Sequence, residues 1–190
     1  PQKEQEFTMT TREAMAELPY NYRITSSPCD KLYRRELFDG LRMQEGMIYE
    51  DAQLQPYLLA RAQRITYTGS PLYRYRLSQG STIRGDFALR HFDCYKASMD
   101  RLAFYEKNFP QQLPYARMGH LETCLNLLYF SRGRREWDGY RKQLKGDLGS
   151  LTPETAALLS KKLRLKLAAA RVGLPVYYLL MWVNGLTKKH

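Results

Sequence analysis

The sequence predicts a mixed α/β segment over residues 1–85 followed by an all-α domain over residues 86–190, so that the chain is mostly helical overall. Before Gly85, short runs rich in β-branched and aromatic residues alternate with turn residues. From about Phe87 onward the pattern changes to long stretches with helical periodicity. With 190 residues, of which 44% are hydrophobic, the chain is long and apolar enough to bury a core.

The first part of the chain predicts short elements joined by irregular segments. Residues 10–18 have a Thr at the capping position and an acid in the first turn, and Pro19 ends this helix. An irregular loop is expected over residues 20–33, with a strand at its end, residues 30–33. Residues 34–40 then predict one or two helical turns closed by a glycine.

A longer helix and two strands are expected next. Residues 52–63 place leucines at helical spacing, with Pro56 early in the helix or at a kink. Residues 64–68 and 72–77 favour strands, and the turn residues Gly69-Ser70-Pro71 separate them. The rest of the chain predicts five helices that are separated by Pro or Gly, at residues 87–109, 113–131, 136–145, 153–172 and 176–186.

The cysteines and the apolar runs indicate the cellular compartment in which the chain is expected. The three cysteines form no Cys-x-x-Cys pair, which favours a reducing, cytoplasmic setting over a disulfide framework. The longest nearly apolar run, residues 172–183, is well short of the roughly 20 residues of a spanning helix, so no transmembrane helix is predicted. Because the chain opens at Pro1 with neither an initiator Met nor a signal segment, we expect a piece of a longer polypeptide.

The net charge of +11 is unevenly distributed along the chain. Residues 1–130 carry 17 Lys and Arg against 15 Asp and Glu, whereas residues 131–190 carry 13 against 4. A basic end that also contains aromatic residues suits anionic lipid headgroups or nucleic acid. An ordinary solvated helical surface explains the same charges equally well.

Two His–Cys pairs have the spacing of metal ligands on a helix: His91 with Cys94, and His120 with Cys124. Each pair lies among aromatic residues that are typical of a core, and Cys is one of the most buried residue types. We therefore predict core packing for both pairs and no metal bound by this chain. The common phosphate-loop, serine hydrolase and zinc protease motifs are also absent from the sequence.

The adjacent carboxylates Glu50 and Asp51 lie where a helix is expected to begin. An Asp at that place can simply cap the helix by accepting hydrogen bonds from the free N–H groups of its first turn. A catalytic base can occupy the same position, and the two interpretations are compatible.

Three motifs occur in a fixed order before residue 85: KLYRRELF at residues 31–38, GMIYED at residues 46–51, and LYRYR at residues 72–76 followed by Ser81. This set resembles the second half of a GT-A-type glycosyltransferase of family 2, the inverting bacterial enzymes that build surface polysaccharides. The resemblance covers roughly residues 10–85. It implies that residues 1–85 are the acceptor-side half of a GT-A-type domain.

The resemblance implies a role for each matching residue. Asp51 would be the general base that deprotonates the acceptor hydroxyl, with Glu50 beside it. The donor diphosphate would contact arginines and a serine of the third motif region, namely Arg74, Arg76, Ser81 and Arg84. The two arginines on the expected strand suit a plain exposed surface equally well. The acceptor cleft would be bordered by Lys31, Tyr33 and Tyr49, of which the first two also fit structural roles.

Two departures from the family pattern limit what this chain can do alone. The nucleotide-binding β-α-β half with its acid-x-acid metal site is missing, and Cys29 replaces a Trp that many relatives carry. We expect the full-length enzyme to use a nucleotide-sugar donor, a glycan or lipid-linked acceptor, and a divalent cation, Mg or Mn, bound outside this chain. The isolated chain should be inactive.

The rival interpretation is a non-enzymatic basic helical protein that binds nucleic acid or a membrane surface through residues 131–190, with Glu50 and Asp51 as a helix cap only. For the enzyme, nucleic acid is an unexpected partner, and a peripheral location at the inner membrane face is expected. Residues 172–183 leave two possibilities open. Leu174, Leu180 and Trp182 are either core residues of the helical domain or part of a membrane-surface anchor.

Overall fold

The computed structural model describes residues 6–70, 72–74, 76 and 88–186, and the chain divides into two compact units, Pro1–Ala116 and Arg117–His190. The expected domain boundary at Gly85 lies outside the described residues. The first unit extends beyond it because helix α3 (Asp93–Asn108) packs against helix α2 (Glu50–Arg61). The units therefore divide later in the chain than the change in sequence pattern does.

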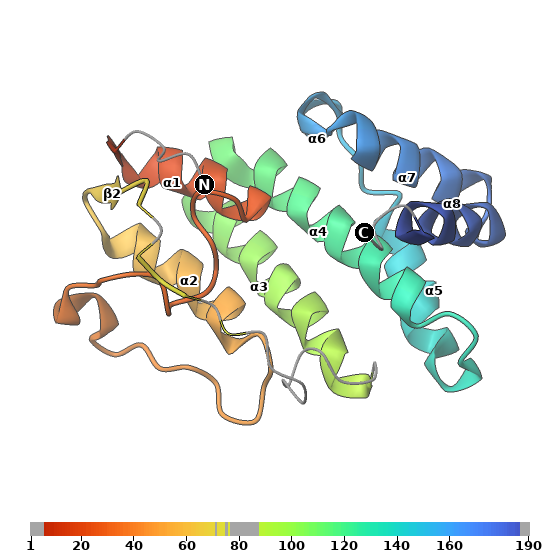
Figure 1. Cartoon of the computed structure of the whole chain (residues 1–190), viewed down its shortest axis with the longest axis horizontal. Helices are drawn as coiled ribbons and strands as arrows, with labels where there is room; N and C mark the ends of the chain where they lie inside the picture. Colours follow the sequence, from red (N-terminus) through yellow and green to blue (C-terminus); the bar gives the residue numbers. More distant parts are fainter. Residues whose placement is uncertain (1–5, 71, 75, 77–87, 187–190) are drawn as a thin grey trace. The chain divides into compact units, whose positions relative to one another are not determined.

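The described residues form eight α-helices and one two-stranded sheet, which confirms the prediction of a mostly helical chain (Figure 1). The sheet pairs β1 (Phe7–Met9) with β2 (Ile65–Tyr67) in antiparallel register, with Thr8 opposite Thr66. The prediction of a strand around β2 is confirmed. Strand β1 was not predicted, because three residues are too few to show an alternating pattern.

The strand predicted at residues 30–33 was wrong. Lys31 Nζ donates hydrogen bonds to the carbonyl oxygen of Ser27 at 2.6 Å and to Thr25 Oγ1 at 2.8 Å, which ties this segment into a local turn. Its backbone pairs with no strand in the described part of the chain, and a strand persists only where its N–H and C=O groups find such a partner. Of the strand predicted at residues 72–77, the described residues 72–74 and 76 are irregular, and the others lie outside the description.

The first helix of this unit begins where its sequence predicts, whereas the helix predicted from residue 87 starts with a 3-10 turn and becomes α3 only at Asp93. Helix α1 (Thr11–Glu17) is preceded by Thr10, which forms a capping box with Glu13, and it runs into a 3-10 turn at Leu18–Tyr20. A second 3-10 helix, Arg35–Phe38, confirms the turns expected at residues 34–40. Further 3-10 turns in the described chain are Leu89–Phe92, Pro110–Gln112 and Arg135–Trp137.

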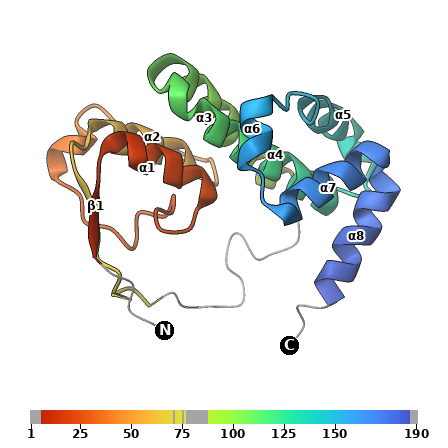
Figure 2. The same ribbon diagram turned by 90° about the horizontal axis from the view of Figure 1, so that it is seen from above.

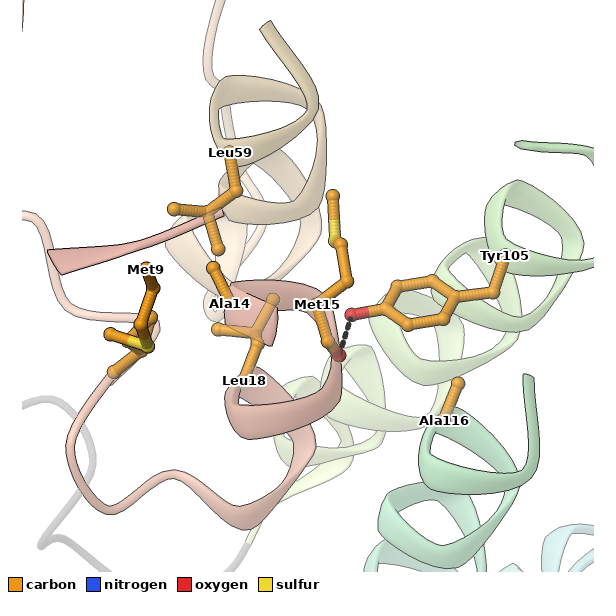
Figure 3. Packing of buried hydrophobic residues seen from close by; sticks show 8 residues of the cluster. Met9, Ala14, Met15, Leu18, Leu59, Tyr105 and Ala116 are labelled. Atoms are coloured by element: carbon orange, nitrogen blue, oxygen red, sulfur yellow. Dashed lines mark hydrogen bonds between the residues drawn. The ribbon is translucent and has the colours of Figure 1, made fainter. Parts of the chain in front are cut away.

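The core of the first unit is built from α1 and the residues that close over it (Figure 3). Met15 and Leu18 are fully buried, and Leu59 of α2 packs against the same cluster. Tyr105 of α3 is also fully buried, and its hydroxyl donates a hydrogen bond of 2.8 Å to the carbonyl oxygen of Met15. This bond meets the polar need of a buried phenol and fixes α3 against α1.

The second unit contains the last described helices: most of α4 (Leu113–Phe130), then α5 (Asp138–Asp147), α6 (Pro153–Leu158), α7 (Lys161–Val172) and α8 (Leu174–Leu186). The single helix predicted at residues 153–172 is instead α6 and α7, because the Ser160 hydroxyl accepts a hydrogen bond from the Leu163 N–H and starts a new helix. Tyr177 of α8 is fully buried and donates to the carbonyl oxygen of Leu125 at 2.8 Å.

None of the helices in the described part of the chain has both the length and the apolar character needed to cross a membrane.

Candidate functional site

Asp51 is the second residue of α2, as the sequence predicts. The chain enters this helix through two residues with positive φ, Gly46 at 75° and Tyr49 at 68°. Glycine adopts such an angle at little cost, but a tyrosine there is strained by roughly 1–2 kcal/mol. Strained backbone of this kind is concentrated at functional sites in proteins, so the strain at Tyr49 marks the start of α2 as a candidate site.

The two oxygens of the Asp51 carboxylate have different surroundings. Oδ1 accepts a hydrogen bond of 2.6 Å from the backbone N–H of Ala52, in the first turn of α2. Oδ2 accepts none from the described residues, and the side chain is half-buried. One oxygen therefore satisfies a free N–H of the first turn, although the N-cap residue of α2 is Tyr49 and not Asp51, and the other oxygen has no hydrogen bond from the described residues. Glu50, the first residue of α2, is half-buried as well.

Two tyrosines lie close enough to Asp51 to feel its charge. Burial raises the pKa of Tyr33 to about 12. A hydrogen bond to Gln55 lowers this pKa, and the negative charge of Asp51 raises it. Burial is the main cause that raises the pKa of Tyr49. The electrostatic effects of Cys94 and Asp51 raise it further. Both phenols are therefore protonated at neutral pH. The Tyr33 hydroxyl donates a hydrogen bond of 2.8 Å to Gln55 Oε1.

Arg101 of α3 supports the first turn of α2 at the point where Pro56 weakens it. Proline lacks the N–H that would bond to the carbonyl oxygen four residues earlier, which belongs to Ala52. Arg101 Nη2 donates to that oxygen at 3.1 Å and to Ser26 Oγ at 3.4 Å. Burial lowers the pKa of Arg101, while Tyr105 and Asp51 raise it, and a guanidinium in such a setting stays charged.

Two buried hydrogen-bond donors at this end of α2 have no partner among the described residues: Gln55 Nε2 and Arg101 Nε. A buried donor without an acceptor costs roughly 1–3 kcal/mol, so these N–H groups favour an oxygen from water or from a ligand. Neither residue was predicted from the sequence. Pro56 was the signal for Arg101, because a proline inside a buried helix requires an outside donor for the carbonyl that it leaves free.

The other site residues that the sequence predicts are not gathered around Asp51 by the described structure. Lys31 is half-buried, and its Nζ forms an ion pair with Asp30 in addition to its bonds within the local turn. Arg74 and Arg76 are exposed. Ser81 and Arg84 lie outside the described residues. The structure therefore groups Asp51 with Tyr33 and Tyr49, whereas the diphosphate-binding roles of the third motif remain predictions.

A pocket of about 370 Å³ is lined by Leu41, Tyr57, Ala60, Arg61, Phe104, Asn108 and Phe109. Arg61 is the last residue of α2, and at 1.5 Å per residue it lies roughly 15 Å along the helix from Asp51. The pocket therefore lies toward the C-terminal end of α2, away from Asp51, although Tyr57 of its lining is only two residues from Gln55.

The two His–Cys pairs differ in the structure. Cys94 Sγ donates to the carbonyl oxygen of His91 at 3.0 Å, and the His91 ring accepts from the Ala88 N–H at 3.0 Å, so this pair bonds to its own local backbone. Burial raises the pKa of the Cys94 thiol to about 12, which keeps it a protonated donor.

His120 and Cys124 of α4 are buried together, and Asp147, the last residue of α5, completes the group. His120 Nε2 lies 3.2 Å from Asp147 Oδ2 and 3.5 Å from Cys124 Sγ. In the described part of the chain, these three side chains are the set that could hold a metal ion together. Burial lowers the pKa of His120 more than the charge and hydrogen bond of Asp147 raise it, so a hydrogen-bonded neutral imidazole explains the geometry without a metal.

Comparison with known proteins returned no similarity to this chain: no family model, curated protein or solved structure matches it.

Proposed function

We propose that the first unit is the acceptor-side part of a GT-A-type inverting glycosyltransferase of family 2, with Asp51 as its general base. The observation that supports this most is the Asp51 carboxylate, which has one oxygen on the helix N-terminus and the other free. The two half-buried tyrosines beside it suit a small ligand rich in hydroxyl groups. The motif resemblance supplies the reaction class.

In the proposed reaction, Asp51 Oδ2 accepts the proton of an acceptor hydroxyl while that oxygen attacks the anomeric carbon of the donor sugar. The bond from the anomeric carbon to the diphosphate oxygen breaks, and the nucleoside diphosphate leaves with the electron pair. The helix N-terminus favours the carboxylate form of Asp51. The nucleotide-sugar donor and the divalent cation would bind to an upstream segment of the full-length protein.

The test is sugar transfer by the full-length protein, measured as nucleoside diphosphate released from a panel of nucleotide sugars. Asp51→Asn keeps the shape of the side chain and removes its basicity, so the turnover rate should fall by roughly 10²–10⁴-fold with donor affinity unchanged. Asp39→Asn is the matched control, because Asp39 is an exposed carboxylate of the same unit. An Asp51→Asn protein that transfers sugar at the parental rate contradicts the proposed role.

A further inference from the structure

Helix α8 presents a wholly apolar face that no described residue covers. Pro175 and four apolar residues occupy this face, and their side chains are exposed by about half: Val176 47%, Leu179 60%, Trp182 55% and Val183 48%. They recur at helical spacing, so they lie on one side of the helix, while the fully buried Tyr177 marks the opposite side. Of the two possibilities that the sequence left open for residues 172–183, core or membrane-surface anchor, the exposure of Trp182 excludes core for that residue, whereas Leu174 and Leu180 are half-buried.

The neighbouring helix of the same unit carries exposed apolar residues as well. Helices α7 and α8 pack side by side, as both views show (Figures 1 and 2). On α7, Leu165 and Val172 are exposed by 56% and 78%. An exposed patch of this extent is unusual on a protein surface without a binding role.

Exposed cations lie on the helix that packs against α8. Lys161, Lys162, Arg164 and Arg171 of α7 are all exposed, and from residue 155 to the end the sequence contains no Asp or Glu. On the other side of α8, burial raises the pKa of Tyr178 while Arg141 and Arg132 lower it, which places both arginines beside this helix. Arg132 is exposed.

The charge pattern decides between possible occupants of this face. A second copy of the chain would bring 14 Lys and Arg against 5 Asp and Glu of its own Arg117–His190 unit toward the same cations, and like charges repel. An anionic bilayer surface attracts each nearby Lys or Arg, and its headgroup boundary accepts Trp, Leu and Val. At 13 residues, α8 suits a position in the plane of the interface.

We propose that the exposed face of α8, together with Leu165 and Val172 of α7, binds the surface of a membrane that contains anionic lipids. The apolar side chains enter the boundary between headgroups and acyl chains, and the neighbouring Lys and Arg side chains contact lipid phosphates. This inference rests on the second unit alone and does not depend on the proposed transferase activity.

The test is co-sedimentation of the chain with vesicles of phosphatidylcholine alone and of phosphatidylcholine mixed with phosphatidylglycerol, at low and high salt. We expect binding to the anionic vesicles, weakened by salt, and little binding to the neutral ones. Leu179→Ser should lower the partition coefficient by about 10-fold, because one buried Leu side chain is lost from the interface. The control Leu32→Ser removes a fully exposed Leu of the first unit and should change nothing.

A second matched pair of variants tests the contribution of the positive charges. Arg171→Gln should weaken anionic binding by about fivefold, whereas Arg35→Gln, an exposed cation of the first unit, should leave it unchanged. Lipids brominated on the acyl chain should quench the exposed Trp182 and leave the buried Trp137 unquenched, and Trp182→Phe should abolish the quenching.

Equal binding to neutral and anionic vesicles, no binding to either, or unchanged binding by Leu179→Ser would overturn the proposal. A concentration-dependent dimer that Leu179→Ser abolishes in sedimentation velocity would assign the face to a second copy and overturn it as well.

Discussion

The two units differ in the kind of group that is left without a partner among the described residues. In the first unit, which carries 16 Lys and Arg against 14 Asp and Glu, the unmet groups are buried and directional: a free carboxylate oxygen and two N–H donors at one helix end. In the second unit the unmet surface is exposed, apolar and accompanied by exposed cations. Directional polar groups select a small ligand by geometry, whereas an apolar face with cations selects a broad anionic surface. The contrast suggests that chemistry belongs to the first unit and attachment to the second.

The largest expected effect comes from testing whether the two units unfold separately. Leu18 in the first unit and Leu125 in the second are both fully buried. Leu18→Ala and Leu125→Ala should each lower the free energy of unfolding by about 2–5 kcal/mol, through lost burial and a cavity. Hydrogen exchange should show each loss confined to the amides of its own unit. Equal loss in both units for either variant would show that they unfold as one.

A smaller effect tests the support that Arg101 gives to α2. Arg101→Met should cost about 1–3 kcal/mol, because the Ala52 carbonyl that Pro56 leaves free loses its donor. Pro56→Ala restores a helix N–H for that carbonyl. In a double-mutant cycle followed by chemical denaturation, Pro56→Ala should therefore stabilise the Arg101→Met protein by about 1 kcal/mol more than it stabilises the parent. Additive effects of the two substitutions would show that Arg101 does not replace the missing helix bond.

The local sequence predicted the helices well, because capping residues, helical periodicity and Pro or Gly breaks act over a few residues. Thr10 and Glu13 predicted the start of α1, and the Glu50-Asp51 pair marked the start of α2. The local signal at Ser160 was overlooked, although a Ser before a run of Lys and Leu is a typical N-cap. At residues 30–33, β-favouring residues gave the wrong answer because a strand depends on a partner that the local sequence does not specify.

The candidate site was predictable only in part. The resemblance pointed to Asp51 and its two tyrosines, which the structure groups together. Gln55 and Arg101 were missed because their roles depend on the packing of α2 against α3, across 46 positions in the numbering. Asp147 was missed for the same reason: it meets His120 from another helix, and nothing in the spacing of His120 and Cys124 indicates a third residue.

The smallest predicted effect concerns His120. It makes the stability of the second unit depend on pH. Burial lowers the pKa of His120 below its ordinary value of 6.5, although Asp147 opposes the shift, so the unfolded chain binds a proton at a higher pH than the folded unit does. Stability from this group is therefore fully present above pH 6.5 and decreases as the pH falls below it, with a slope of at most about 1.4 kcal/mol per pH unit. Hydrogen exchange of the second unit between neutral and mildly acidic pH measures this decrease, and His120→Gln should flatten it. Because all other titratable groups, including His190 of the same unit, are identical in the two proteins, the difference between parent and variant isolates His120. The same slope in both proteins would show that protonation of His120 is not linked to folding.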